Sequence, residues 1–342
     1  MTILPAVAAF SAFAITALLG KWIIPFLRKL KFGQTILDIG PSWHKSKEGT
    51  PTMGGIMIAI GLFTSLILTF TVSAISKTGG LWAETADGDK MSMLISGIGL
   101  AVSTGLIGFF DDYIKVVKKR NLGLTAKQKT FLQLIVAAAY LLSLKLTGMD
   151  TTWIPFIGGV SIVSGIGLVF WPIALLFIYG FTNAVNLTDG LDGLASSVTL
   201  VVATFFMLAA GVLGNVSMNV LGAVLAGACV GFLMWNAHPA KVMMGDTGSM
   251  FLGGMIVALS FGIGRPVLLL LAGIVYFAEA VSVMLQVAYY KKTKKRLFKM
   301  SPIHHHYEMS GWSEEKIVFV FSVVALLGCL IAFLPIAIDR FL

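Results

Sequence analysis

Charged residues are scarce in this 342-residue chain. Only 12% of its residues are Asp, Glu, Lys or Arg, whereas 57% are hydrophobic, and the mean hydropathy is +0.90. A soluble domain is typically about 25% charged and about half apolar, and a larger apolar excess cannot be hidden in a water-soluble core. The composition therefore excludes a soluble globular protein and predicts an all-α integral membrane protein.

Cysteine is also rare. Cys229 and Cys329 both fall in apolar runs, where a free cysteine packs as a small hydrophobic residue. We therefore expect no disulfide. The sequence also lacks the paired thiolates or spaced imidazoles of a zinc site.

Apolar runs recur along the whole chain. A bilayer core of about 30 Å takes about 20 helical residues to cross. Ten runs of that size predict about ten transmembrane helices in a single polytopic membrane domain over residues 1–342. These runs cover residues 2–24, 52–75, 92–111, 130–147, 168–186, 193–213, 218–236, 247–264, 266–290 and 316–337.

The basic residues are distributed unevenly between these runs. Of the 25 Lys and Arg residues, 19 fall in the first, third, seventh and ninth loops. By the positive-inside rule these loops are cytoplasmic, so both termini are predicted to be extracytoplasmic. The net charge of +9 then reflects membrane orientation, and no nucleic-acid partner is expected. On the opposite face, a Gly-rich alternating segment at 153–167 predicts a small external hairpin.

Acidic residues gather at the predicted cytoplasmic ends of the spans. An acid at or within a span is a candidate functional residue, because leaving it in hydrocarbon costs several kcal/mol. Helix capping is an alternative explanation for Asp192 and Asp246, but it does not explain why five acids converge. The five are Asp111, Asp112, Asp189, Asp192 and Asp246.

The run from 181 to 193 has a polar residue at every third position. On an ideal helix each step of three slips by about 60°, so the four residues can face one pocket only if the helix breaks. Gly190 and Gly193 are the expected break, and irregular backbone at membrane depth is tolerated where it lines a wet cavity. The residues are Asn183, Asn186, Asp189 and Asp192, of which we expect the last three to line a cavity.

Asp246 lies between two glycines at the predicted start of a helix. Oxygen ligands on a tight turn suit Mg²⁺, which one or two carboxylates commonly hold together with substrate phosphates. The neighbours Asp111 and Asp112 point about 100° apart on a helix. One of them can therefore meet the ion or the nucleophile while the other orients a base.

Two groups of possible phosphate donors lie in the predicted cytoplasmic loops. His304, His305 and His306 can donate to phosphate or sugar oxygens, although the basic loop that carries them could simply contact anionic lipid. Lys127 and Lys129 can bind phosphate, or can serve orientation alone. In the ninth span, Glu279 and Gln286 are interpreted as polar residues that face the bundle.

Six segments, taken in order, resemble the phospho-N-acetylmuramoyl-pentapeptide transferase family, within the polyprenyl-phosphate N-acetylhexosamine-1-phosphate transferase superfamily. The aspartate motifs mark the superfamily, and the histidine segment resembles this family in particular. The segments are HKSKEGTPTMGG at 44–55, GFFDDYIKV at 108–116, GLTAKQK at 123–129, NAVNLTDGLDGLA at 183–195, WNAHPAKVMMGDTGS at 235–249 and KMSPIHHHYE at 299–308.

The resemblance implies an enzyme of the bacterial inner membrane, with its active site on the cytoplasmic face and contact with membrane lipid. Such an enzyme uses Mg²⁺ to transfer phospho-MurNAc-pentapeptide from UDP-MurNAc-pentapeptide to undecaprenyl phosphate. The products are lipid I and UMP, in peptidoglycan synthesis. The resemblance also implies a ten-span fold, a homodimer and a cytoplasmic cleft.

Matching positions carry the family's functional residues onto this chain. One position departs from the pattern, because Met243 stands where the family usually has Phe, so an aromatic face for stacking uracil is absent there. The implied metal ligands are Asp246 and Asp111. The implied catalytic residues are Asp111, Asp112, Asp246 and His304. The implied substrate-binding residues are Lys47, Thr52, Lys127, Lys129, Asn186, Asp189, Asp192, Asn236, Met243, Gln286, His305 and His306.

Three other functions are weighed against this one. A sister enzyme that moves another UDP-HexNAc phosphate would share the aspartate motifs, but the histidine triplet argues against it. A secondary transporter should place ionisable residues at mid-membrane, whereas here the acids lie near one face and Glu279 alone is deep. An inactive scaffold is disfavoured because the aspartates are intact.

Overall fold

The computed structural model describes residues 3–30, 47, 49–77, 80–117 and 123–341. Several basic positions of the predicted cytoplasmic loops lie outside the described residues. They are Lys31, Lys45, Lys118, Lys119 and Arg120.

Helices make up most of the described chain. The elements in order are α1 (Leu4–Lys29), α2 (Gly55–Ser76), α3 (Gly80–Glu84), α4 (Gly88–Val117), α5 (Ala126–Leu146), β1 (Thr151–Ile154), β2 (Gly158–Ser161), the 3₁₀ helix η2 (Gly165–Val169), α6 (Phe170–Thr188), α7 (Leu194–Val212), α8 (Val216–Asn236), α9 (Gly245–Gly262), α10 (Leu268–Ala272), α11 (Ile274–Thr293), α12 (Ile303–Glu308) and α13 (Glu314–Phe341).

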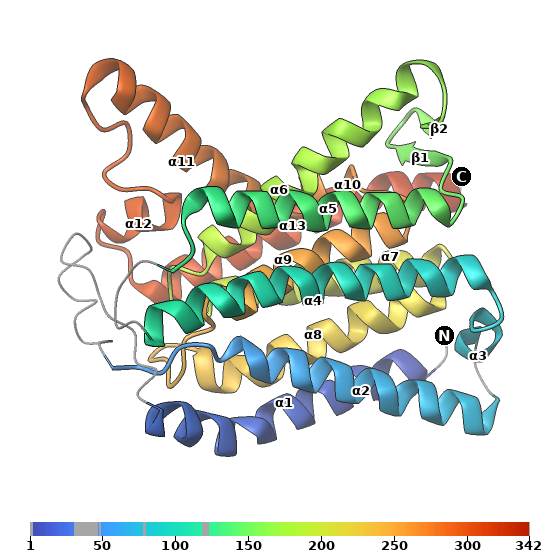
Figure 1. Ribbon diagram of the computed structural model, residues 1–342, viewed down its shortest axis with the longest axis horizontal. Coiled ribbons are helices and arrows are strands. Elements are labelled where there is room, and N and C mark those ends of the chain that lie inside the picture. Colours follow the sequence, from blue (N-terminus) through green and yellow to red (C-terminus); the bar gives the residue numbers. More distant parts are fainter. Residues whose placement is uncertain (1–2, 31–46, 48, 78–79, 118–122, 342) are drawn as a thin grey trace.

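The long helices lie side by side along one axis (Figure 1). Both chain termini and the β1–β2 hairpin are at one end of this bundle, while α12 and the start of α13 are at the other. The arrangement agrees with the prediction that both termini are on the same side. The face of the membrane that each end meets stays a prediction.

Within the described residues, eight helices are long and apolar enough to cross a membrane. They are α1, α2, α4, α5, α6 with the preceding η2, α7, α8 and α13. α9 follows the predicted eighth span closely. The predicted ninth span, 266–290, is divided at Gly273 into α10 and α11. The multi-pass helical class is therefore confirmed, whereas the count of ten stays a prediction.

The centre of the bundle is formed by α8 and α9. In α8, 78% of the apolar window is buried, against 28% in α1, and α9 is buried from Thr247 to Gly262. Glycines allow this density, as is usual between helices in a membrane. A Cβ on Gly253 would lie 2.9 Å from Thr182 Cα, and one on Gly254 would lie 2.7 Å from Ala101 Cα. Both cysteines are buried and free, as predicted.

The predicted hairpin is present, with slightly different limits. β1 and β2 pair antiparallel from Thr151 with Ser161 to Ile154 with Gly158. Residues 165–167, which the prediction included, belong instead to η2 (Gly165–Val169). The guanidinium of Arg265 stacks on Trp153 at 3.8 Å from the ring centre, so the hairpin is attached to the segment between α9 and α10.

Glu84 joins α3 to the start of α8 at the same end of the bundle as the termini. Its carboxylate accepts hydrogen bonds from Val216 N (3.0 Å), Ser217 N (2.8 Å) and Ser217 Oγ (2.7 Å), and pairs with Lys90 Nζ at 3.0 Å. Burial alone would raise the pKa of Glu84, but these donors outweigh it and lower the pKa. The carboxylate therefore satisfies backbone N–H groups that α8 itself leaves unpaired.

Candidate active site

Three aspartates from two helices meet at the end of the bundle opposite the termini. Asp111 and Asp112 lie near the end of α4, and Asp246 lies in the first turn of α9. Their nearest carboxylate oxygens are within 4.8 Å of one another. Close approach of the two helices requires Gly108, where a Cβ would lie 2.0 Å from the Asp246 carbonyl oxygen. This group, the aspartate cluster, offers oxygen ligands that suit a divalent cation.

Asp112 anchors α4 to the start of α9. Its Oδ2 accepts hydrogen bonds from Thr247 N (2.9 Å) and Thr247 Oγ1 (2.7 Å). Gly245 precedes this turn with a φ of +74°, and a Cβ there would lie 2.7 Å from Asp112 Oδ2 and 2.8 Å from Thr52 Oγ1. The glycine is therefore required both by backbone conformation and by space, and Asp112 is suited to hold the cluster in place.

Asp111 faces Lys115 and the segment before α5. Its Oδ1 accepts a hydrogen bond from Leu124 N at 2.8 Å, and its Oδ2 pairs with the Lys115 ammonium. Lys115 is four residues along the same helix and so lies on the same face. In the sequence, Lys115 is one of the basic residues of the third predicted loop, which indicated orientation alone. Its spacing of four residues from Asp111 was the signal that could have placed it in the site.

Asp246 is the best-connected carboxylate of the aspartate cluster. Its Oδ2 pairs with Lys129 Nζ at 2.7 Å and with Lys115 Nζ at 3.2 Å. Its Oδ1 accepts a hydrogen bond from Asn186 Nδ2 at 2.9 Å. Lys129, and not the exposed Lys127, thus reaches the cluster from the first turn of α5. Asn186 reaches it from α6.

The chain breaks between α6 and α7, as the glycines predict. α6 ends at Thr188 and α7 begins at Leu194, with Gly193 at a φ of +77° between them. Asn183 does not join the site; its Nδ2 donates to Gln133 Oε1 on α5 at 2.7 Å. The turn at residues 189–192 carries Asp189 and Asp192 beside the aspartate cluster.

Asp189 lies at the C-terminal end of α6 beside the aspartate cluster. Burial raises the pKa of Asp189 well above its usual range, and the carboxylates of Asp246 and Asp112 act in the same direction. A hydrogen bond with the Gly245 backbone opposes them. Like charges crowded in this way are costly unless a cation is near, so the electrostatics favour cation binding.

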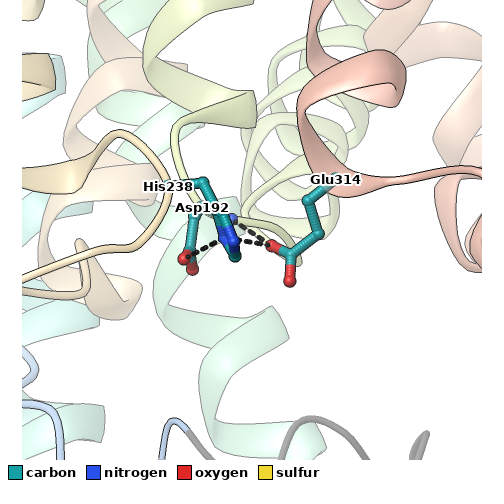
Figure 2. A group of neighbouring side chains, drawn as sticks. All are labelled: Asp192, His238 and Glu314. Carbon is teal, nitrogen blue, oxygen red and sulfur yellow. Dashed lines mark hydrogen bonds and ion pairs between the residues drawn. The ribbon is translucent and has the colours of Figure 1, made fainter.

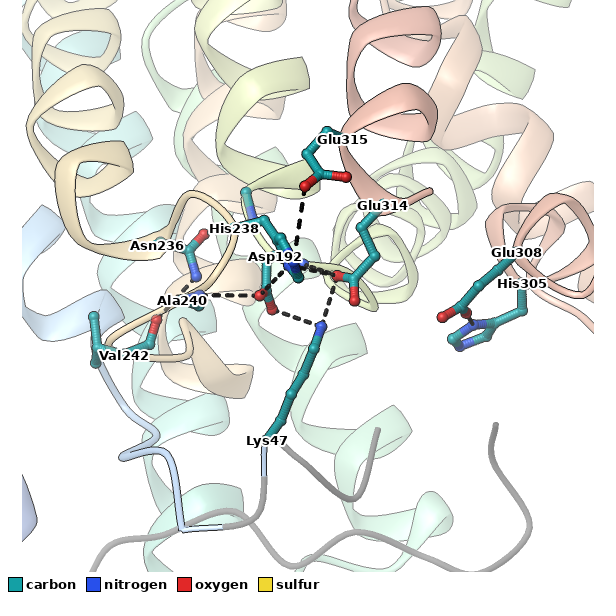
Figure 3. A network of polar contacts seen from close by, with 11 residues as sticks. Lys47, Asp192, Asn236, His238, Ala240, Val242, His305, Glu308, Glu314 and Glu315 are labelled. Carbon is teal, nitrogen blue, oxygen red and sulfur yellow. Dashed lines mark hydrogen bonds and ion pairs between the residues drawn. The ribbon is translucent and has the colours of Figure 1, made fainter. Parts of the chain in front are cut away.

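A second polar group adjoins the turn. This group, the Asp192 cluster, consists of Lys47, Asp192, His238 and Glu314. Figure 2 shows Asp192, His238 and Glu314 pointing toward one another, and Figure 3 also shows Lys47. Lys47 Nζ pairs with Asp192 Oδ1 at 2.8 Å and with Glu314 Oε2 at 2.6 Å. Asp192 Oδ2 contacts His238 Nδ1 at 3.1 Å and accepts a hydrogen bond from Ala240 N at 3.0 Å.

Sequence reasoning missed two members of this cluster. His238 belongs to the quoted WNAHPAKV segment, but it was assigned no role. Glu314 is the first residue of α13 and lies outside every quoted motif. Asp192 is 122 residues from Glu314 along the chain, and no local pattern could have indicated that contact.

The three histidines face different partners. His304 is fully buried, with Nδ1 3.1 Å from Glu279 Oε1. His305 Nδ1 lies 2.8 Å from Glu308 Oε2, and His306 Nδ1 accepts a hydrogen bond from Lys299 N at 3.1 Å. Each histidine of the triplet therefore has its own contact. Their role in substrate binding stays a prediction.

Glu279 and Gln286 do not share a partner. Glu279 pairs with His304, whereas Gln286 Oε1 accepts hydrogen bonds from Leu297 N (3.0 Å) and Phe298 N (2.9 Å). Gln286 thus shapes the chain after α11. Its predicted contact with substrate is not tested by these bonds.

Asn236 and Met243 connect backbone segments around the aspartate cluster. Asn236 is buried, where its Oδ1 accepts from Gly193 N at 3.1 Å and its Nδ2 donates to the Val242 carbonyl oxygen at 3.0 Å. The Met243 backbone donates to the carbonyl oxygen of Pro51 (2.8 Å) and accepts from Gly54 N (2.9 Å). Asn236 thus joins the start of α7 to the segment before α9, and Met243 joins that segment to residues 51–54. The substrate contacts of both residues stay predictions.

The fold and this site define a helical membrane protein with clustered carboxylates and ammonium groups at one end. The Glycosyl transferase family 4 model matches residues 94–263, and the phospho-N-acetylmuramoyl-pentapeptide-transferase signature 1 matches residues 47–58. These ranges include the aspartate cluster and Lys47.

Curated relatives narrow the class further. The phospho-N-acetylmuramoyl-pentapeptide-transferase of Clostridioides difficile is 44% identical over 92% of this chain and 92% of its own length. Those of Halalkalibacterium halodurans and Acetivibrio thermocellus are 44% and 45% identical over 94% of this chain and over 94% and 92% of their own lengths, respectively. The chain belongs to the phospho-N-acetylmuramoyl-pentapeptide-transferase family.

Proposed function

We propose that this protein transfers phospho-MurNAc-pentapeptide from UDP-MurNAc-pentapeptide to undecaprenyl phosphate, forming lipid I and UMP in peptidoglycan synthesis. The observation that carries the proposal is the match to named transferases at 44% identity over 92% of both chains. The aspartate cluster supports the proposal. Catalysis of phosphoryl transfer mainly requires that the protein position the reacting groups and neutralise charge, and the cluster's carboxylates and ammonium groups can do both.

The aspartate cluster is the proposed place of the reaction. Lys115 and Lys129, which contact Asp246, can bind the diphosphate of the donor. Asp111 can accept the proton of the lipid phosphate, whose oxygen then attacks the phosphorus attached to the sugar. The bond from that phosphorus to the UMP oxygen breaks, and UMP leaves. An Asp carboxylate that attacks first is the two-step alternative, which a trapped phospho-aspartate would establish.

Mg²⁺ is the proposed cofactor. Three oxygen ligands within 4.8 Å and the crowding of carboxylates around Asp189 fit a divalent cation. Asp246 and Asp111 would hold it, with Asp112 fixed by Thr247 beside them. When bound, the ion supplies positive charge that stabilises the diphosphate as UMP departs.

The location of the site follows from the same reasoning. The enzyme is proposed to reside in the bacterial inner membrane as a multi-pass homodimer, with the aspartate cluster on the cytoplasmic face. Basic residues near this end, such as Lys115 and Lys129, favour that face and concentrate the anionic substrates. Ser310 follows α12 and Phe156 lies in the β1–β2 hairpin, at opposite ends of the bundle. Labelling of S310C and F156C with a membrane-impermeant thiol reagent in intact cells tests the orientation.

A reconstitution assay tests the function. Purified protein, UDP-MurNAc-pentapeptide, undecaprenyl phosphate and Mg²⁺ should release UMP and form a lipid-linked product. Chelation should abolish release, and added Mg²⁺ should restore it. UDP-GlcNAc in place of the donor is the matched control, since a higher rate with UDP-GlcNAc would assign the sister activity instead.

A further inference from the structure

Glu314 occupies a junction between three segments that are distant in the sequence. The Asp192 cluster joins the first loop through Lys47, the 189–192 turn through Asp192, and the start of α13 through Glu314 (Figure 3). The ammonium of Lys47 lies between the two carboxylates, at 2.8 Å from Asp192 Oδ1 and 2.6 Å from Glu314 Oε2. Both carboxylates therefore hold the Lys47 ammonium in place.

A single oxygen of Glu314 serves two of these segments. Besides the Lys47 ammonium, Glu314 Oε2 accepts a hydrogen bond from the backbone N–H of Asp192 at 3.2 Å. The side chains of Lys47, Asp192 and Glu314 are only 15%, 2% and 9% exposed. Charge-assisted hydrogen bonds are strong where water is largely excluded, so Glu314 fixes both the lysine and the turn.

We propose that Glu314 is a positioning residue for binding of the sugar-nucleotide donor. This inference rests on the proposed function. Glu314 acts through Lys47 and through the turn that carries Asp189 and Asp192, which adjoins the aspartate cluster. Its carboxylate is already committed to those partners, so it holds the binding groups in place without touching the reacting atoms.

The position of the Asp192 cluster favours the donor over the lipid substrate. The cluster is built from loops and helix ends, including His238 and Ala240 between α8 and α9. A water-soluble nucleotide approaches these loops from solvent, whereas a polyprenyl phosphate approaches from the bilayer. Loss of Glu314 should therefore weaken donor binding more than it slows the chemical step or weakens lipid binding.

Replacing Glu314 with Gln tests the charge while keeping the shape. The carboxamide oxygen of E314Q can still accept the Asp192 N–H, but it no longer balances the Lys47 ammonium. We expect the KM for UDP-MurNAc-pentapeptide to rise about tenfold, the usual scale for one buried charge-assisted bond, with kcat changed less than about threefold. The KM for undecaprenyl phosphate should stay unchanged.

Glu315 provides the matched control. It is the next residue on α13, and its side chain is 62% exposed. Its only contact with the Asp192 cluster among the described residues is a long one, 3.8 Å from Glu315 Oε1 to His238 Nε2, and an exposed ion pair of this kind contributes little, so E315Q should behave as the wild type. Titration calorimetry of each variant with UDP-MurNAc-pentapeptide gives donor affinity independently of turnover. An equal loss for E314Q and E315Q, or a fall in kcat alone, would overturn the positioning role.

A double-mutant cycle separates positioning from general destabilisation. If Glu314 acts through Lys47, E314Q should have little further effect on donor affinity in a K47M background. Fully additive losses would refute the inference. The two proposals fail differently: a wild type that releases no UMP contradicts the proposed function, whereas an active wild type with an unaffected E314Q contradicts only the role of Glu314.

Discussion

Glu84 and Asp246 are carboxylates that meet the start of a central helix, but Glu84 is buried, Asp246 is partly exposed, and their surroundings differ. Glu84 meets the start of α8 and is surrounded by hydrogen-bond donors from Val216, Ser217 and Lys90. Asp246 lies at the start of α9 with two more carboxylates within 4.8 Å. The carboxylate of Glu84 has enough donors and stabilises the fold. At Asp246, the two ammonium groups of Lys115 and Lys129 balance only part of the negative charge of three neighbouring aspartates, and a cation can balance the rest.

Removing the charge of Asp246 should have the largest effect on activity. D246N keeps the size of the side chain but weakens its contacts with Lys115 and Lys129, and with them the proposed cation site. We expect kcat to fall about 10³-fold, at the upper end of losses for one electrostatic group in an active site. UMP release measured beside E84Q checks this, and a D246N enzyme with more than a tenth of wild-type activity would contradict it.

Lys129 should matter more than its neighbour Lys127. Lys129 Nζ lies 2.7 Å from Asp246 Oδ2, whereas the Lys127 side chain is exposed. We expect K129M to lower kcat/KM about 30-fold, since a hydrogen bond between charged groups contributes about 2 kcal/mol. K127M should lower it less than about threefold. Equal losses in the two variants would mean that both lysines bind the substrate.

A methyl group at Gly190 should disturb the site moderately. A Cβ there would lie 2.2 Å from His304 Nε2, whereas a Cβ on Gly180, in the second half of α6, would meet nothing within 4 Å. We expect G190A to lower kcat/KM about tenfold by displacing the 189–192 turn, roughly the cost of a small overpacking. G180A is the control, and similar activity in both variants would show that the turn tolerates displacement.

Changing Glu84 should affect stability and leave catalysis intact. E84Q should lower the free energy of unfolding by about 1–2 kcal/mol near pH 7, because buried donors lose a charged acceptor. Since the folded-state pKa of Glu84 is lowered from 4.5, its contribution is present above that value and is lost as the pH falls below it. Thermal unfolding of both proteins from pH 7 to pH 4 should therefore show a narrowing difference, and a widening one would contradict the assignment.

Much of the architecture could be predicted from local patterns. The apolar runs predicted the positions of the long helices, the alternating segment predicted the hairpin, and Gly190 with Gly193 predicted the break after α6. Each of these depends on residues that are close in the chain, where hydropathy and backbone freedom act directly. The division at Gly273 was missed because the apolar pattern continues through it.

The amino-acid sequence by itself determined that the chain is helical and apolar, with aspartates at the ends of several predicted spans. Only the tertiary structure decided which side chains meet. Asp112 contacts Thr247, 135 residues away in the chain, and Lys47 contacts Glu314, 267 residues away. Helix formation depends on neighbours along the chain, whereas the meeting of side chains depends on how glycine-lined helices pack. For that reason Lys115, His238 and Glu314 could be recognised as partners of the site only in three dimensions.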